Sequence, residues 1–225
     1  MPLVNGRFPV MKEKQPIVYI INDDVSVREG MADLLRSVGH AVQPFGSTHD
    51  FLDNAPSDGP GCIVLDVRLP GPSGLEFQRI LSKLNIQIPI VFISGHADIP
   101  MSVRAIKSGA IEFLTKPVNE QQLLDAVQAG IERDRARWEE AKVIADLKER
   151  FDSLTPREQE ILSLLLSGRA NKQIAAQLGL SEMTVKVHRS AIMRKTQAGS
   201  LVHLVRMADK ICIPMQDTLP PKPKH

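Results

Sequence analysis

Residues 62–74 read CIVLDVRLPGPSG, an apolar run that stops at Asp66 and gives way to a loop rich in Pro and Gly. A short run rich in β-branched side chains is typical of a strand buried on both faces of a parallel sheet. Comparable runs are IVYII at 17–21, AVQPF at 41–45, IPIVFIS at 88–94 and IEFLTKP at 111–117. Segments with helical periodicity separate them, and Gly39 and Gly109 stand where two helices should stop. The sequence therefore predicts an α/β domain, with a doubly wound five-stranded parallel sheet between layers of helices.

The composition of the chain excludes several classes of protein. Its 225 residues are 43% hydrophobic and 24% charged, as in a soluble globular protein. No apolar stretch approaches the roughly 20 residues of a membrane span, and residues 1–15, which we expect to be disordered, lack the apolar segment of a signal peptide. We therefore expect a cytoplasmic protein with no membrane partner. Cys62 and Cys212 are far apart and lack metal-ligand spacing, which favours structural thiols over a disulfide or a zinc site.

A long helix is predicted from Asn119, which begins a capping box with Gln122. No Pro follows until Pro156, and a helix of some thirty residues would extend roughly 45 Å. Such a helix would hold two domains apart or pair with its twin in a dimer. The alternative is an ordinary last helix followed by a charged, solvated linker. We place the sheet domain at 16–130 and a helical linker at 131–152.

The carboxyl-terminal third is predicted to be all-helical. A second capping box, formed by Thr155 and Glu158 with Pro156 between them, begins a segment in which four helices are expected over 156–167, 171–178, 182–195 and 199–211. This domain would span 153–212, and the Pro-rich tail at 213–225 is expected to be disordered. Residues 153–225 carry 11 basic and 5 acidic side chains, against 11 and 12 in residues 1–118. A basic segment of this kind is suited to binding a phosphate backbone.

Polar residues gather where the predicted strands end. These positions are Asn22-Asp23-Asp24, Asp66, Ser94-Gly95-His96 and Thr115-Lys116-Pro117. Ligands of a doubly wound sheet bind at this edge. Two nearby carboxylates favour a divalent cation between them, and Lys116 and Ser94 would supply a positive charge and a hydroxyl donor. Asp66 could then attack phosphorus in line while these groups neutralise the developing charge.

Residues 16–130 resemble a receiver domain of the flavodoxin-like fold, through IINDDVSVRE, IVLDVRLPGPSG, VFISGHADIPMSV and GAIEFLTKP. The resemblance implies that Asp66 is the phosphoacceptor and that Asp23, Asp66 and the Arg68 carbonyl bind Mg²⁺. It further implies that Ser94 and Lys116 contact the phosphoryl group, that Phe113 is the switch aromatic, and that the peptide bond before Pro117 is cis. Arg68 and His96 would flank the phosphoryl group and tune its hydrolysis.

The chain departs from this family at Asn22, where an acid is usual. Asn22 keeps an oxygen that could reach the metal through a water, but it lacks the charge, so we expect weaker Mg²⁺ binding. Aligning Asp23 and Asp24 with the acid pair instead would shift the strand by one residue and reverse its apolar face, which we disfavour.

Residues 153–211 resemble a LuxR-type DNA-binding domain through LTPREQEILSLLLSGRANKQIAAQLGLSEMTVKVHRSAIMRK. Gly179 permits a tight turn, and Ser181 caps the helix that follows. In this recognition helix, Val185, Ile192 and Thr196 should face the core of the domain. The opposite side of the helix is then free to enter a major groove. The resemblance implies that Lys186, Val187 and Ser190 contact base edges, and that Lys172, Thr184, Arg189 and Lys195 contact phosphates.

Together the two resemblances indicate a two-component response regulator of the NarL/FixJ type. We expect a histidine kinase to phosphorylate it, and we expect the active form to be a homodimer that binds double-stranded DNA and works with RNA polymerase. A phosphorylation-independent DNA-binding protein, with the receiver as a docking or dimer module, is one alternative. A Mg²⁺-dependent aspartyl-phosphate phosphatase is less favoured, because Arg68 stands where such enzymes carry a second acid. We therefore do not expect an enzyme.

Overall fold

The computed structural model describes residues 15–54, 59–95 and 99–213. By its internal contacts the chain divides between Trp138 and Glu139 into two compact units, each described separately below. The predicted disordered N-terminus lies almost wholly outside the described residues, as does the tail beyond residue 213. Within the described part of the chain, no helix is long and apolar enough to cross a membrane.

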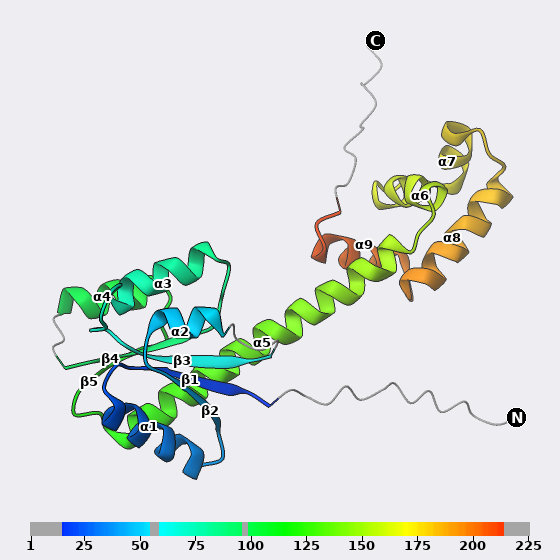
Figure 1. Cartoon of the computed structure of the whole chain (residues 1–225). Coiled ribbons are helices and arrows are strands. Elements are labelled where there is room, and N and C mark those ends of the chain that lie inside the picture. Colours follow the sequence, from blue (N-terminus) through cyan, green and yellow to red (C-terminus); the bar gives the residue numbers. More distant parts are fainter. Residues whose placement is uncertain (1–14, 55–58, 96–98, 214–225) are drawn as a thin grey trace, which may run out of the picture. The chain divides into compact units, whose positions relative to one another are not determined.

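The first unit contains a five-stranded sheet in which every pair of neighbouring strands is parallel (Figure 1). The strands lie in the order β2-β1-β3-β4-β5, so the chain order reverses between β1 and β3. They are Ile17–Ile21 (β1), Ala41–Phe45 (β2), Gly61–Asp66 (β3), Ile90–Ser94 (β4) and Glu112–Thr115 (β5). This is the predicted doubly wound sheet.

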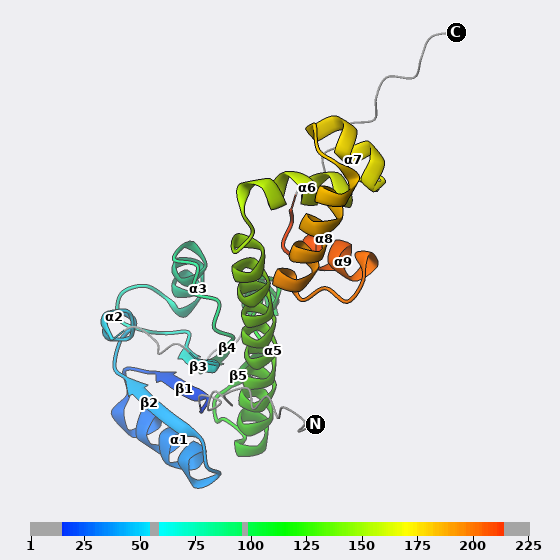
Figure 2. The same ribbon diagram turned by 90° about the vertical axis from the view of Figure 1, so that its right-hand side faces the viewer.

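Helices cover both faces of the sheet (Figure 2). They are Val25–Ser37 (α1), Thr48–Asp53 (α2), Gly74–Lys83 (α3), Ile99–Lys107 (α4) and the long helix Glu120–Asp152 (α5). One apolar core joins α1 and α5 to side chains such as Val18 and Val64, and the other joins α2, α3 and α4 to side chains such as Ile63 and Phe92. Because β1, β3 and β4 are buried along almost their whole length, their apolar runs need no alternation.

Helix α5 is continuous over 33 residues, which confirms the long helix rather than the helix with an irregular linker. Asn119 caps it, since its side chain accepts a hydrogen bond from the backbone N–H of Gln122. Ile131 is buried in the first unit, whereas Leu147 and Phe151 are buried in the core of the second. Both ends of the segment predicted as a linker therefore belong to hydrophobic cores.

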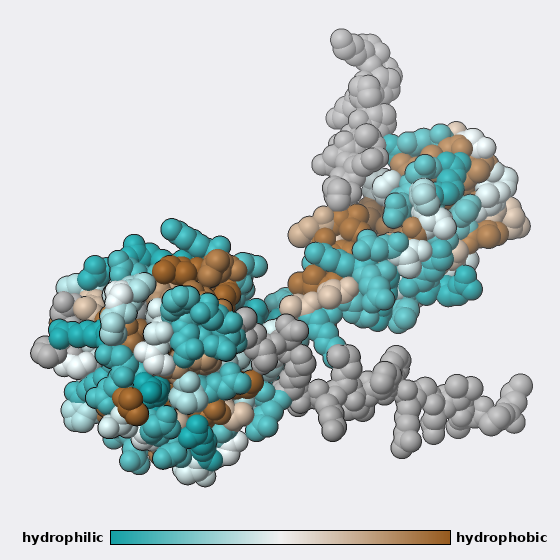
Figure 3. Space-filling model, in the orientation of Figure 1, coloured by the Kyte–Doolittle hydropathy of each residue, from teal (hydrophilic) through white to brown (hydrophobic). Residues whose placement is uncertain are grey.

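The second unit contains the last part of α5 and the helices Pro156–Leu166 (α6), Asn171–Leu178 (α7), Glu182–Thr196 (α8) and Leu201–Lys210 (α9). These helices lie within two residues of their predicted bounds at each end. Thr155 and Glu158 form the predicted capping box of α6, and Ser181 caps α8. In the space-filling view, hydrophobic areas interrupt a largely hydrophilic surface on the visible face of each unit (Figure 3).

Candidate functional site

Asp66 is the last residue of β3 and is only 5% exposed. Its Oδ2 accepts hydrogen bonds from Asn22 Nδ2 at 3.1 Å and from Lys116 Nζ at 2.5 Å. Its Oδ1 accepts one from the backbone N–H of Arg68 at 2.9 Å. A buried carboxylate is costly unless it is paired, and these three donors, one of them charged, meet that cost.

The tips of β4 and β5 bring Ser94 and Lys116 to the same edge of the sheet. Ser94 pairs with Thr115 in the sheet register, and its carbonyl accepts a hydrogen bond from the Lys116 N–H at 2.8 Å. Ser94 is fully buried, and the Lys116–Pro117 peptide bond is cis, as the receiver resemblance implied. The sheet thus brings together the predicted acid, hydroxyl and lysine.

The three polar residues after β1 have separate roles. Asn22 is buried next to Asp66, Asp23 is exposed, and Asp24 is the N-cap of α1, where its side chain accepts from the Val27 N–H at 3.1 Å. The contact of Asn22 with Asp66 and the capping role of Asp24 support the register with Asn22 at the site over the one-residue shift. Arg28, which the sequence analysis did not single out, donates to the Asn22 carbonyl at 2.5 Å and so holds the loop after β1.

The loop after β3 can turn back over the sheet because residue 74 is Gly. A Cβ there would lie 2.7 Å from the Asp66 carbonyl oxygen, closer than real Cβ contacts allow. Ser73 and Glu76 form a capping box at the start of α3. Hydrogen bonds from the Ser73 N–H and hydroxyl lower the pKa of Glu76, so this cap persists into mild acid.

Three further residues were predicted to act around the phosphoryl group. Phe113, on β5, is half-buried, and its ring centroid lies 6.1 Å from that of Phe92. The Arg68 side chain is exposed, while its N–H binds Asp66. His96 lies outside the described residues.

The oxygen donors that Mg²⁺ prefers are limited at this site. The carboxylates of Asp23 and Asp66 and the Arg68 carbonyl would be suitable ligands. Asn22, in contrast, turns its amide N–H toward Asp66, and its Oδ1 accepts from the Asp24 N–H at 2.9 Å. Among the described residues, no three His, Cys, Asp or Glu side chains gather in one place. By residue type the site could supply a divalent ion with two carboxylates and one carbonyl, one acid fewer than the receiver resemblance implies.

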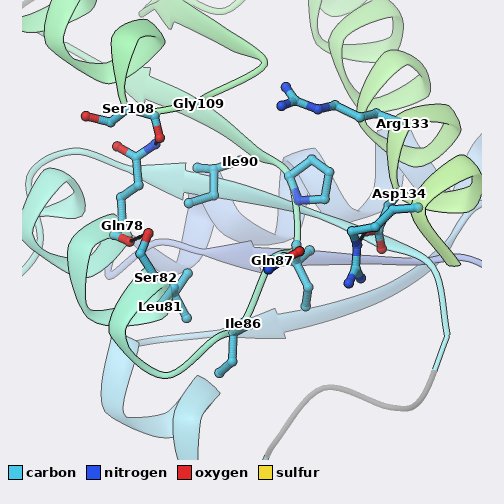
Figure 4. A pocket seen from close by; sticks show the side chains of 13 residues that line it. Gln78, Leu81, Ser82, Ile86, Gln87, Ile90, Ser108, Gly109, Arg133 and Asp134 are labelled. Carbon is cyan, nitrogen blue, oxygen red and sulfur yellow. Dashed lines mark hydrogen bonds and ion pairs between the residues drawn. The ribbon is translucent and has the colours of Figure 1, made fainter. Parts of the chain in front are cut away.

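A cavity of about 450 Å³ lies at the other edge of the sheet, where β4 begins, so it is separate from the Asp66 site (Figure 4). Figure 4 shows Arg133 and Asp134 entering it from α5 and Gln78 from α3. Gln78 donates to the Ser108 carbonyl at 3.0 Å, and Ser82 donates to the Gln78 carbonyl at 3.0 Å. These polar groups of the wall are therefore already bonded to one another.

Asp134 links α5 to the start of β3 by a hydrogen bond. Although it interrupts the apolar stripe of the helix, it is fully buried, and it accepts hydrogen bonds from the Gly61 N–H at 2.8 Å and from Arg137 Nε at 2.7 Å. Burial raises the pKa of the neighbouring Cys62 thiol, and the Asp134 charge raises it further, so this thiol is unreactive. Cys62 is buried and free as expected; Cys212 is free but exposed.

The second unit contains a helix-turn-helix built from α7 and α8. Gly179 ends α7 at φ +64°, a left-handed conformation that favours glycine, and Ser181 accepts from the Thr184 N–H at 3.0 Å. Val185, Ile192 and Thr196 are fully buried, as the predicted core side of α8 required.

The residues of α8 that were predicted to contact DNA differ in their exposure. Lys186, Val187 and Ser190 are exposed there, and Lys172 is exposed on α7. Arg189 is half-buried and donates to Asn171 Oδ1 at 3.3 Å, and the half-buried Thr184 bonds to the Ser181 hydroxyl. The remaining exposed residues of this side are Glu182, Met183 and Arg194, none of which the sequence analysis selected, although helical spacing from Val187 and Ser190 points to Met183 and Arg194.

Lys195 is half-buried and makes its contacts within the unit. Its Nζ lies 2.6 Å from Glu158 Oε2 and donates to the Ser153 carbonyl at 3.3 Å. Burial on its own would raise the pKa of Glu158, but hydrogen bonds from Lys195 and from the Thr155 N–H outweigh it, and the pKa is lowered. Lys195 therefore links α8 to the cap of α6.

Comparisons with known proteins identify the family of each unit. Residues 18–128 match the family of response regulator receiver domains, and residues 152–208 match the luxR family of bacterial regulatory proteins. Nodulation protein W of Bradyrhizobium diazoefficiens is 50% identical over 202 residues, which cover 90% of this chain and 89% of that protein. The chain belongs to the LuxR-type response regulators.

Other response regulators match over similar lengths. Response regulator protein TodT of Pseudomonas putida is 44% identical over 93% of this chain and 95% of its own. The solved structure of response regulator StyR aligns with a TM-score of 0.80 and 48% identity, over 87% of this chain and 99% of that one. Full-length FixJ from B. japonicum aligns with a TM-score of 0.53 and 36% identity, over 87% and 97%.

These matches confirm the predicted family and fold class. This response regulator is a two-component transcriptional regulator that joins a receiver to a LuxR-type DNA-binding domain. The Asp66 site is part of its receiver, and α7 and α8 are part of its DNA-binding domain.

Proposed function

We propose that this response regulator binds DNA under the control of phosphorylation at Asp66, with a sensor histidine kinase as donor. The observation that carries the proposal is the pairing of Asp66 with Lys116 Nζ at 2.5 Å, beside the buried Ser94. A nucleophilic carboxylate needs a cation to offset the charge of the incoming phosphoryl group, and Lys116 is placed to supply it.

In the proposed reaction, an Asp66 carboxylate oxygen attacks phosphorus, and the bond from phosphorus to the kinase histidine nitrogen breaks. Lys116 moves with the charge from the carboxylate to the phosphoryl oxygens, while the Ser94 hydroxyl donates to one of them. Asp23, Asp66 and the Arg68 carbonyl would hold Mg²⁺, which supplies further positive charge at the phosphoryl oxygens. The side chains of Arg68 and His96 would flank the product and set how fast water removes the phosphoryl group.

We further propose how the receiver controls the output. Phe113 is half-buried against Phe92, and it would turn further inward when Ser94 moves toward a phosphoryl group. Activation would then form a homodimer through the face made by α4, β5 and α5 and release or align the DNA-binding domain. In this account the receiver spans 16–130, the linker 131–152 and the DNA-binding domain 153–212, and the active cytoplasmic dimer acts on RNA polymerase.

For DNA recognition, we propose that α8 enters the major groove with Lys186, Val187 and Ser190 toward base edges. Lys172, Thr184 and Arg189 would contact phosphates. Lys195 is a seventh proposed contact, and it would have to exchange its ion pair with Glu158 for a phosphate.

Mass spectrometry tests the phosphorylation proposal. The full-length protein is incubated with Mg²⁺ and a small phosphodonor, beside an Asp66→Asn variant that keeps the shape of the site. We expect the wild type to gain the mass of one phosphoryl group and the variant to gain none. Addition of phosphoryl groups to both proteins alike would place the modification elsewhere.

The amide of Asn22 favours one alternative. Because it donates to Asp66 Oδ2 at 3.1 Å, the carboxylate is satisfied without a metal, as a receiver that works without phosphorylation would allow. In that case the wild type would gain no mass yet bind DNA. Release of phosphate in many turnovers without DNA binding would instead favour a phosphatase.

A further inference from the structure

The recognition helix α8 presents two large apolar side chains to solvent. Met183 is 67% exposed and Val187 is 62% exposed, and the two are four positions apart in the helix. Residues at i and i+4 lie side by side on a helix surface, so the two side chains form one apolar patch. This patch lies on the side of α8 that is proposed to face DNA. An exposed apolar patch at such a place indicates a contact with a partner rather than with water.

The surroundings of this patch favour nucleic acid over a second protein. Lys186, Ser190 and Arg194 are exposed on the same side of α8, and the single acid of the helix, Glu182, is its first residue. Residues 153–225 carry a net excess of six basic side chains. An apolar patch bordered by cations is complementary to an apolar group that lies between phosphates.

We propose that Met183, together with Val187, recognises thymine methyl groups and so sets part of the operator sequence. The C5-methyl of thymine is the apolar group that a standard base pair offers in the major groove, and apolar side chains pack against it. Met183 is the second residue of α8, and the amino-terminal part of a recognition helix is the part that meets base edges. The flexible thioether of Met183 suits it to a contact of this kind. This inference rests on the proposed DNA-binding function and adds its sequence preference.

The spacing of the patch predicts the spacing of the methyl groups. Four residues advance a helix by about 6 Å, whereas successive bases of one strand are about 3.4 Å apart along the duplex. A helix that follows the groove would therefore place Met183 and Val187 over thymines about two base steps apart.

The test begins with duplexes selected from a random pool by the full-length protein, with and without Mg²⁺ and a small phosphodonor. In the best-bound duplex, each thymine of one half-site is replaced in turn by uracil, which removes only the methyl group. Dissociation constants are measured by fluorescence anisotropy for the wild type, Met183→Ala and Val187→Ala. Val202→Ala is the matched control, because Val202 is 64% exposed but belongs to α9.

We expect one uracil substitution to weaken wild-type binding about fourfold, the worth of one buried methyl group, and we expect this penalty to vanish in Met183→Ala. A second penalty about two steps away should vanish in Val187→Ala, and both should persist in Val202→Ala. Penalties that are absent in the wild type, or that survive in Met183→Ala, would overturn the inference while leaving DNA binding intact. Loss of self-association in Met183→Ala with unchanged penalties would overturn it in favour of a second copy of the chain. Failure to enrich any duplex would overturn the proposed function itself.

Discussion

Replacing Asn22 with aspartate should turn a site that is stable without metal into one that requires it. In the wild type, Asn22 Nδ2 donates to Asp66 Oδ2 at 3.1 Å, and Asn22 is only 1% exposed. Aspartate would exchange this donor for a charged oxygen at the same place, whereas it could keep the hydrogen bond from the Asp24 N–H. Because the position is buried, the new carboxylate cannot turn away into solvent.

The size of the destabilisation follows from one lost hydrogen bond and one new charge repulsion. A hydrogen bond to a charged group contributes about 1.5 to 3 kcal/mol, and two unit charges about 4 Å apart repel by about 4 kcal/mol at an effective dielectric constant of 20. Lys116 and partial protonation offset part of this repulsion. We therefore expect Asn22→Asp to lower the free energy of unfolding of the receiver by about 2 to 4 kcal/mol in the absence of metal.

Urea unfolding followed by circular dichroism, in EDTA and in millimolar Mg²⁺, measures this change. Mg²⁺ should stabilise Asn22→Asp more than the wild type by at least about 1.4 kcal/mol, which corresponds to tenfold tighter binding. Asn85→Asp adds the same charge in the loop after α3, at the other edge of the sheet, and should leave both values near those of the wild type. Equal stability of Asn22→Asp and wild type in EDTA would refute the assigned role of the Asn22 amide.

Three further changes test the interactions that hold each unit together. Asp134→Ala removes the hydrogen-bond partner of the Gly61 N–H and of Arg137, so the free energy of unfolding measured in urea should fall by about 2 to 4 kcal/mol. A stability equal to that of the wild type would contradict the role of Asp134 in joining α5 to β3. The lowered pKa of Glu158 means that its stabilising effect is present above its usual pKa of 4.5 and is lost as the pH falls through its lower folded value. Glu158→Gln should therefore flatten the acid dependence of thermal unfolding and cost about 1 kcal/mol at neutral pH; an unchanged acid profile would count against the Lys195 pairing. Gly179→Ala, at φ +64°, should cost about 1 to 2 kcal/mol in the same assay, while Gly199→Ala, at an open position without positive φ, should cost far less.

The sequence predicted those features that depend on neighbours along the chain. The apolar runs located all five strands, and capping residues located the helices of the second unit; α8 was expected at 182–195 and is Glu182–Thr196. The site at the strand tips could be predicted as well, because the parallel order of the strands brings Asp66, Ser94 and Lys116 to one edge.

What sequence periodicity missed were contacts between distant segments. Asp134 is polar within an apolar stripe, and its burial is explained by its contact with Gly61, 73 residues away, together with its pairing to Arg137. Lys195 is a basic residue of the recognition helix, and nothing in its spacing indicates an ion pair with Glu158, 37 residues earlier. The donor role of the Asn22 amide depends equally on tertiary geometry.

The shared helix α5 also limits how this gene could be recombined. Leu147 and Phe151 precede the luxR-family match, which begins at residue 152, yet both are buried in the core of the second unit. A chimaera joined at residue 152 would therefore supply foreign side chains to that core. Val143, in contrast, is 46% exposed and lies beyond Trp138, where the first unit ends. Crossover points that exchange one receiver for another are thus confined to the short stretch between Glu139 and Asp146. The join must also add or remove no residues, so that the two parts of α5 keep their helical phase.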